Sequence, residues 1–263
     1  MKNGKPRIAV HKFASCDGCQ LAFLNAGEAL LELAQRADIV HFAEAGWHAP
    51  FAPVDIAFVE GSVSTPEDAE RILAVRQSAR YLVTLGACAA AGGMQALRNG
   101  LAQAADWIRD IYASPQYIRS LPDSHPIAAH VRVDLELWGC PVTTGQVLAA
   151  TGDLLRGIAP ANPAEPVCVE CKRRQRACVL VGKGEPCLGP VTRSGCGALC
   201  PAVGRACYGC FGPAELPNAG ALARRFESLG LSREEIARRF LFITPAAEPF
   251  HETGRRYREP ARE

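Results

Sequence analysis

Cysteine constrains the fold of this chain more than any other residue type. The 263 residues include 12 cysteines, and eight of these lie between Cys168 and Cys210. In a secreted protein this number would indicate a disulfide framework. The apolar segment that follows Met1 to Arg7, however, is shorter than the roughly 7–15 residues of a signal-peptide core. We therefore expect a reducing, cytoplasmic compartment, where cysteines more often bind metal or act in catalysis.

Composition argues against two classes of protein. Lys+Arg 29 and Asp+Glu 27 give a formal net charge of +2, which is too small for a dedicated nucleic-acid binder. No apolar run reaches the ~18 residues of a transmembrane helix, so we expect no membrane span. A chain of this length can bury a core without covalent cross-links, and its near-neutral surface suits a protein partner.

The first 160 residues alternate between strand-like and helix-like segments. Apolar runs predict strands, and helical spacing of apolar residues predicts the helices between them. The predicted strands cover 7–13, 39–42, 54–60, 81–85 and 131–137, and the predicted helices cover 21–36, 66–80 and 143–156. Thr65 is the expected N-cap of the second helix, with Pro66 at its first position. The alternation predicts an α/β fold with a doubly wound parallel sheet.

Four cysteines come directly after predicted strands: Cys16, Cys19, Cys88 and Cys140. In an open parallel sheet, ligands bind at the edge formed by the carboxyl ends of the strands. These four side chains can therefore converge on one metal site. The alternative is a redox dithiol at Cys16 and Cys19, as in thioredoxin-type sites, but it leaves the other two cysteines without a role.

The remaining eight cysteines follow a Pro-rich boundary, Ala159 to Pro166. They are Cys168, Cys171, Cys178, Cys187, Cys196, Cys200, Cys207 and Cys210. Gly and Pro separate them and hydrophobic periodicity is weak, so we expect bound metal to supply much of the folding free energy. The two C-x2-C pairs also fit zinc sites in a binding module, with nearby Lys and Arg residues contacting phosphate. Cys200-Pro201 is typical of iron–sulfur proteins.

Taken together, these motifs resemble the small, electron-transferring subunits of nickel–iron hydrogenases. The resemblance is carried by Cys16-Asp17-Gly18-Cys19, Glu60-Gly61-Ser62, Gly86 to Gly93, Gly139-Cys140-Pro141, Cys187 to Cys196 and Gly204 to Cys210. It is closest to the delta subunits of cytoplasmic NAD(P)-linked, sulfhydrogenase-type enzymes. It implies a flavodoxin-like domain over 1–160, a loop-rich iron–sulfur cluster domain over 161–217 and a helical extension with a tail over 218–263.

The resemblance also implies three [4Fe–4S] clusters. Its expected ligands are Cys16, Cys19, Cys88 and Cys140 for the proximal cluster, Cys196, Cys200, Cys207 and Cys210 for the medial cluster, and Cys168, Cys171, Cys178 and Cys187 for the distal cluster. This chain departs from periplasmic members, in which a histidine stands at the place of Cys168 and many medial clusters lack a counterpart of Cys200. Crossing of ligands between the medial and distal clusters therefore stays open.

The nickel–iron site of this family lies on a separate large subunit, so the resemblance implies no catalytic residue on this chain. Electrons would pass to a flavin- and NAD(P)-binding subunit and to iron–sulfur diaphorase subunits. The small subunit of a ferredoxin- or quinone-linked redox complex is the alternative within the electron-transfer class.

Residues after Pro217 predict two short amphipathic helices, 219–229 and 232–242, the second opened by a capping box of Ser232 and Glu235. The segment 251–263 is predicted to be a mobile tail. Glu60 is expected to be a solvated or hydrogen-bonding group, in preference to a proton relay. We expect the three tryptophans, Trp47, Trp107 and Trp138, in the core or in an interface.

Overall fold

The structure, a computed structural model, describes residues 4–99 and 104–259. Its first part contains a five-stranded sheet with the order β2-β1-β3-β4-β5. The strands are β1 Arg7–Lys12, β2 Asp38–Phe42, β3 Val54–Glu60, β4 Ala79–Leu85 and β5 Leu135–Leu137. All neighbouring strands pair in parallel. This order and direction confirm the predicted flavodoxin-like, doubly wound sheet.

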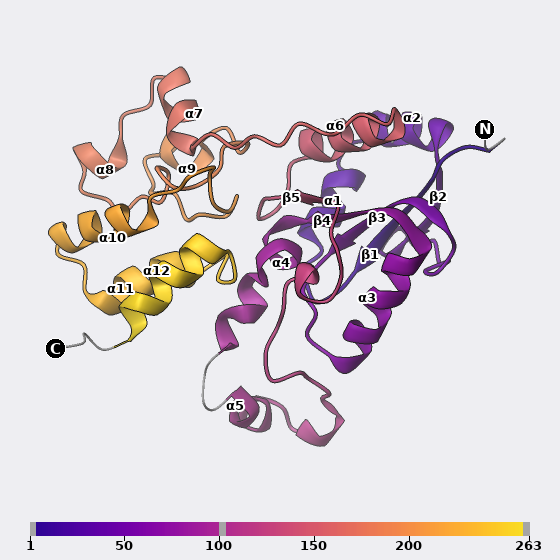
Figure 1. Cartoon of the computed structure of the whole chain (residues 1–263), viewed down its shortest axis with the longest axis horizontal. Coiled ribbons are helices and arrows are strands. Elements are labelled where there is room, and N and C mark those ends of the chain that lie inside the picture. The colour runs from indigo at the N-terminus through magenta and orange to yellow at the C-terminus, as the bar shows by residue number, and fades with distance from the viewer. Residues whose placement is uncertain (1–3, 100–103, 260–263) are drawn as a thin grey trace.

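Helices cover both faces of the sheet (Figure 1). The helices of this part are α1 Gly18–Leu24, α2 Glu28–Arg36, α3 Pro66–Ser78, α4 Gly86–Ala91, α5 Ala104–Ile111 and α6 Thr144–Leu155. Phe23 of α1 and Val147 of α6 pack with Ile8, Val10 and other residues on one face. On the other face, Ile72 of α3 and Ala89 of α4 pack with Val59 and its neighbours. Alternate strand residues thus face two separate hydrophobic layers.

Helix α3 begins at the residues that the sequence predicted. The Thr65 hydroxyl accepts a hydrogen bond from the backbone N–H of Asp68 at 3.1 Å, and Pro66 begins α3. The single predicted helix over 21–36 is wrong, because the chain forms α1 and α2 instead. Gly27 adopts a φ of 56° between them, which a helix does not allow. The strand predicted over 131–137 is also shorter than expected, since β5 begins only at Leu135.

The second part combines cysteine-rich loops with six helices. They are α7 Val167–Arg173, α8 Val179–Gly182, α9 Leu199–Ala202, α10 Ala219–Ser228, α11 Arg233–Leu241 and α12 Glu248–Arg258. Val167, Leu188 and Val191 from the loop region share one hydrophobic core with Phe226 and Phe240 of α10 and α11. The cysteine-rich segment thus buries several apolar side chains, because the C-terminal helices supply the apolar partners that the segment itself lacks.

The C-terminal segment is folded where a mobile tail was predicted. Phe250 of α12 is fully buried and Tyr257 is nearly so, and both belong to the core of the second part. Arg233 of α11 donates hydrogen bonds of 2.7 Å to the carbonyl oxygens of Arg256 and Glu259. The prediction is thus wrong for 251–258, and residues 260–263 lie outside the described residues.

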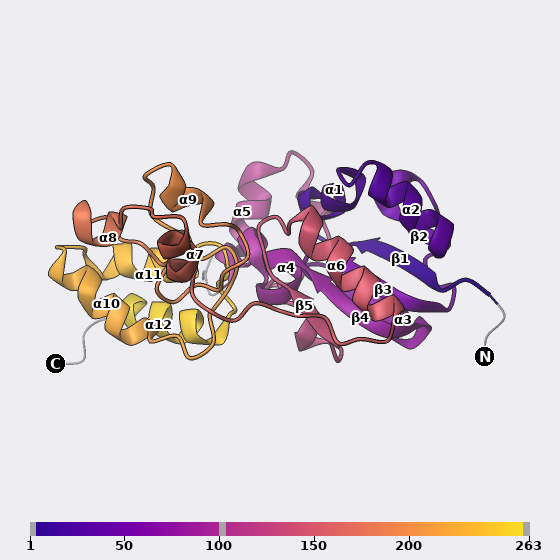
Figure 2. The same ribbon diagram turned by 90° about the horizontal axis from the view of Figure 1, so that it is seen from above.

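The two parts lie end to end, with α4 and β5 next to the cysteine-rich loops (Figures 1 and 2). Ala91 of α4 and Trp138, which follows β5, belong to the core of the second part. The backbone N–H of Ala246 donates to the carbonyl oxygen of Ala91 at 3.1 Å. Trp138 is therefore an interface residue as predicted, whereas Trp47 and Trp107 are about half exposed, at 47% and 48%.

Among the described residues, no helix is both long enough and apolar enough to cross a membrane.

Candidate functional site

Four cysteines gather at the carboxyl edge of the sheet, as the sequence predicted. Cys16 precedes α1 and Cys19 lies within it, Cys88 lies in α4 directly after β4, and Cys140 follows β5. The pKa of the Cys88 thiol rises to about 11, mainly because of burial and further because the thiols of Cys140 and Cys16 are close. Burial and then the thiol of Cys16 also raise the pKa of Cys140. Residues far apart in sequence thus share one site.

Two glycines leave room for the sulfur atoms of this set. A Cβ atom on Gly86 would lie 2.4 Å from the Sγ of Cys19, and one on Gly93 would lie 2.5 Å from the Sγ of Cys88. Both glycines also adopt a positive φ, of 80° and 61°. These two positions require glycine for close approach as well as for backbone conformation.

Glu60 supports the same site from the end of β3. Its Oε1 accepts the backbone N–H of Cys19 at 2.9 Å, and its Oε2 accepts a hydrogen bond from the Gln20 side chain at 3.0 Å. Glu60 is only 2% exposed, and this burial raises the pKa of its carboxyl group. The hydrogen-bonding interpretation is confirmed, while the solvated one is wrong.

A second set of four cysteines surrounds α7 and α8. Cys168 and Cys171 lie in α7, Cys178 directly precedes α8, and Cys187 lies in the following loop. The pKa of Cys168 rises to about 11, first through burial and then through the thiols of the other three. Gly189 lies against this set, because a Cβ on it would lie 3.3 Å from the Sγ of Cys187 and 3.7 Å from the Sγ of Cys168.

The third set consists of Cys196, Cys200, Cys207 and Cys210. Burial raises the pKa of the Cys210 thiol to about 12, and the thiols of Cys196, Cys140 and Cys200 contribute in that order. This third set therefore adjoins the first through Cys140 and Cys210.

The third set also adjoins the second. The backbone N–H of Cys207 donates to the Sγ of Cys187 at 3.2 Å, and the N–H of Gly189 donates to the same sulfur at 3.4 Å. The N–H of Gly209 donates to the Sγ of Cys207 at 3.5 Å. The third set thus adjoins both of the others.

The donors in these sets suit iron–sulfur clusters. Clusters are held by cysteine sulfur and tuned by hydrogen bonds to sulfur and by burial, and all of these features are present. Within 4–99 and 104–259, no three His, Cys, Asp or Glu side chains are close enough together to bind one metal ion. A four-iron cluster binds each cysteine through a different iron atom, so its ligands do not need to meet at one point.

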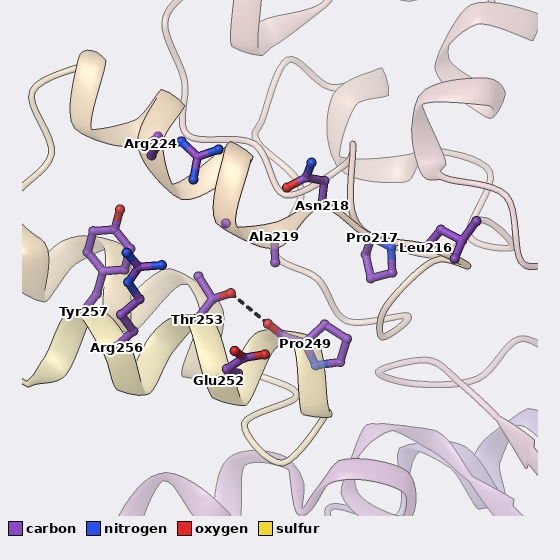
Figure 3. Close-up of a pocket in the computed structure, with 11 residues that line it drawn as sticks. Leu216, Pro217, Asn218, Ala219, Arg224, Pro249, Glu252, Thr253, Arg256 and Tyr257 are labelled. Atoms are coloured by element: carbon purple, nitrogen blue, oxygen red, sulfur yellow. Dashed lines mark hydrogen bonds between the residues drawn. The ribbon is translucent and has the colours of Figure 1, made fainter.

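A cavity of about 430 Å³ lies apart from the cysteines, between α10 and α12. Arg224, Glu252, Arg256 and Tyr257 line it (Figure 3), and Thr253 donates to the carbonyl oxygen of Pro249 at 2.9 Å beside it. Because none of its lining residues is a cysteine, we do not assign it to the metal sites.

Comparison with known proteins identifies the family. A family model described as NADH ubiquinone oxidoreductase, 20 Kd subunit, matches residues 16–154. The delta subunit of sulfhydrogenase 2 from Pyrococcus furiosus is 35% identical over 233 residues, which are 89% of this chain and 97% of that protein. The chain belongs to this family as a hydrogenase small subunit.

Two further relatives agree with this membership. The delta subunit of the NAD-reducing hydrogenase HoxS from Cupriavidus necator is 27% identical over 171 residues, or 59% of this chain and 81% of that protein. A chain in the crystal structure of an NAD+-reducing [NiFe]-hydrogenase in the H2-reduced state is 32% identical. That match covers 61% of this chain and 96% of the other, with a TM-score of 0.56. The protein is thus a small subunit of a [NiFe] hydrogenase with a role in electron transfer.

Sequence reasoning missed two residues that lie against cysteine sulfur atoms, Gly93 at Cys88 and Glu170 at Cys196. Gly93 is part of the motif that carried the resemblance, but its contact with the Cys88 sulfur was not predicted. Glu170 stands between Cys168 and Cys171, and its position inside a C-x2-C pair was the only available signal.

Proposed function

We propose that this small subunit carries three [4Fe–4S] clusters and relays electrons between the NiFe site of its large subunit and a flavin- and NAD(P)-binding partner in the cytoplasm. The observation that carries the proposal is that cysteines adjoin one another from the sheet edge to α7. The thiol of Cys88 is close to those of Cys140 and Cys16, that of Cys210 to those of Cys196, Cys140 and Cys200, and that of Cys168 to those of Cys187, Cys171 and Cys178. When bound, such clusters accept and release single electrons.

The ligand assignment follows the three sets. We assign Cys16, Cys19, Cys88 and Cys140 to the proximal cluster, Cys196, Cys200, Cys207 and Cys210 to the medial cluster, and Cys168, Cys171, Cys178 and Cys187 to the distal cluster. The contacts of the third set with both others support its medial position. Glycines leave space for the sulfur atoms, and backbone N–H groups donate hydrogen bonds to them. Such hydrogen bonds adjust the reduction potential of a bound cluster.

The exposure of individual cysteines supports a placement of the two partners at opposite ends of the series of sites. Cys16 and Cys140 are exposed at the sheet edge, so we place the large subunit there. Cys178 is exposed at the other end of the series, next to Arg173, Arg174 and Arg176 in sequence. This basic segment suits an acidic surface on the electron-accepting partner. The NAD-reducing relatives support flavin-containing and iron–sulfur diaphorase subunits as that partner.

The proposed domain division keeps the sheet domain at 1–160, the cluster segment at 161–217 and the helical extension at 218–263. The extension supplies the apolar side chains against which the cluster segment packs. Its function is therefore to support the medial and distal sites.

Metal analysis tests the proposal directly. The complex is purified anaerobically and the small subunit is then separated from its partner subunits, because those partners are expected to carry iron of their own. Iron, acid-labile sulfide and zinc are measured per small subunit. We expect about twelve iron and about twelve sulfide. About two or three zinc without sulfide would instead contradict the electron-transfer proposal and support a zinc-stabilised binding module.

A further inference from the structure

Glu170 lies on α7, whose two cysteines are proposed distal ligands, but its side chain reaches the loop of a proposed medial ligand. Its Oε1 accepts the backbone N–H of Gly195 at 3.0 Å, and its Oε2 accepts the N–H of Ala198 at 2.9 Å. The same Oε2 lies 3.9 Å from the Sγ of Cys196. One carboxylate therefore holds the chain on both sides of Cys196.

The loop that Glu170 holds has an unusual backbone. Gly195, Gly197 and Ala198 all have a positive φ, of 124°, 68° and 53°. For Ala198 this conformation costs about 1 kcal/mol or more and persists only where the surroundings impose it. The hydrogen bond from Ala198 to the Glu170 carboxylate is one such constraint, and Ala198 is fully buried.

The guanidinium group of Arg174 lies against the same loop, four residues after Glu170 in the chain. A Cβ on Gly197 would lie 2.9 Å from the Nη2 of Arg174, so the guanidinium group lies directly on the loop backbone. Residues four apart in a helix face the same side, and here Glu170 and Arg174 both contact residues 195–198. The segments of α7 and α9 lie side by side in Figures 1 and 2. The distal and medial segments thus meet at this contact.

We infer that Glu170 is a positioning residue that fixes Cys196 relative to α7 and places a negative charge between the medial and distal clusters. The inference rests on the proposed function. A carboxylate near a cluster disfavours the added electron, so it lowers the reduction potential of that cluster. Its two hydrogen bonds keep the Cys196 loop closed around the site.

Glu165 is a matched control for this function. It is a glutamate five residues earlier in the chain, and its side chain pairs with Arg173 at 2.8 Å on an exposed surface. Loss of its charge removes a surface ion pair that contributes little to stability. E165Q and E170Q therefore change the net charge equally but differ in contact with a cysteine loop.

The experiment compares wild type, E165Q and E170Q as complexes purified anaerobically with their partner subunits. Redox titration followed by electron paramagnetic resonance gives the midpoint potential of each cluster. We expect E170Q to shift the medial potential, and to a smaller extent the distal potential, to more positive values, while E165Q matches wild type. Iron loss to a chelator should be about 10- to 100-fold faster in E170Q.

A second variant separates the effect of the Glu170 charge from that of its side-chain length. E170D keeps the charge but is one methylene shorter, so its potentials should lie closer to wild type than those of E170Q. Unchanged potentials and an unchanged rate of iron loss in E170Q would overturn the inference. A wild-type small subunit that contains no iron and no acid-labile sulfide after separation from its partners would overturn the proposed function itself, so the two failures are distinguishable.

Discussion

Cys19 is the most enclosed thiol of the sheet-edge set, because it is 7% exposed and its N–H donates to Glu60. Serine has nearly the same shape, so C19S should fold normally. It should still block electron entry, because a serine hydroxyl replaces one proximal thiolate. We expect hydrogen-dependent dye reduction by the complex to fall to background, with the circular dichroism of wild type. S15A, beside the site but outside the ligand set, should keep full activity, and retention of full activity by C19S would contradict the proximal assignment.

Gly93 provides a test of whether the same site depends on the close approach of the backbone to the sulfur of Cys88. In G93A the new methyl group would lie 2.5 Å from the Sγ of Cys88 at a φ of 61°. We expect a loss of stability of about 1 kcal/mol or more, together with a lower iron content. G152A is the control, because Gly152 lies within α6 with nothing within 4 Å of a new Cβ. It should be neutral or stabilise by about 0.4–1 kcal/mol in urea unfolding. Equal effects would show that the contact with sulfur is unimportant.

At the scale of elements, β1 and β2 hold two neighbouring buried histidines. The ring centroids of His11 and His41 are 4.7 Å apart. His11 is 3% exposed, and its Nε2 has no hydrogen-bond partner among the residues that the structure describes. Burial, followed by the charges of His41 and Arg71, lowers the pKa of His11 from 6.5 to about 3. The unfolded chain therefore binds a proton at a higher pH than the folded chain does.

Folding stability should consequently fall as the pH drops from about 6.5 towards 3, by up to about 1.4 kcal/mol per pH unit for this proton. Urea unfolding at a series of pH values measures the slope. H11Q should flatten it, because Gln does not titrate, whereas H251Q changes an exposed ring and should leave it unaltered. If the slope were the same in H11Q and wild type, this would contradict the assignment of the pH dependence to protonation of His11.

The elements that sequence predicted well have strong local signals. Val54 to Glu60 is an apolar run, and the Thr65-Pro66 pair marks a helix start; both positions match the structure. The convergence of the early cysteines was also predictable, because strand ends define the ligand edge of a parallel sheet.

Other elements depend on distant contacts that the sequence does not reveal. Phe250 and Tyr257 have helical spacing, but arginines surround them, and only the core of the second part explains why α12 folds. Glu170 could not be placed in a site either, because its contacts lie 25 and 28 residues away in the chain.

At the scale of the whole molecule, Trp138 joins the two parts. Gly212 lies on its indole ring with a φ of 70°, and a Cβ there would lie 2.2 Å from the ring atom Cε3. Arg193 lies 5.9 Å from the centre of the same ring system and donates to the carbonyl oxygen of Pro213 at 3.2 Å. Trp138 lies two residues before Cys140 and Gly212 lies two residues after Cys210, so this contact affects how the proposed proximal and medial sites meet.

G212A should open this joint. We expect a larger radius of gyration by small-angle scattering and greater exposure of Trp138 in fluorescence quenching. G230A is the matched control, because Gly230 also has a positive φ, of 88°, but has nothing within 4 Å of a new Cβ. Backbone strain alone would affect both variants equally, whereas loss of the joint should appear only in G212A.

The shared core of the cysteine-rich loops and α10 to α12 has a consequence for biosynthesis. During translation the N-terminal part of a chain leaves the ribosome first, and domains fold as units in that order. The sheet can close as soon as β5 and α6 emerge, but Leu188 and Val191 have no complete core until Phe226, Phe240 and Phe250 have left the exit tunnel. The segment of α10 to α12, which is translated after the loops, therefore decides when the loops become a stable receptor for their metal.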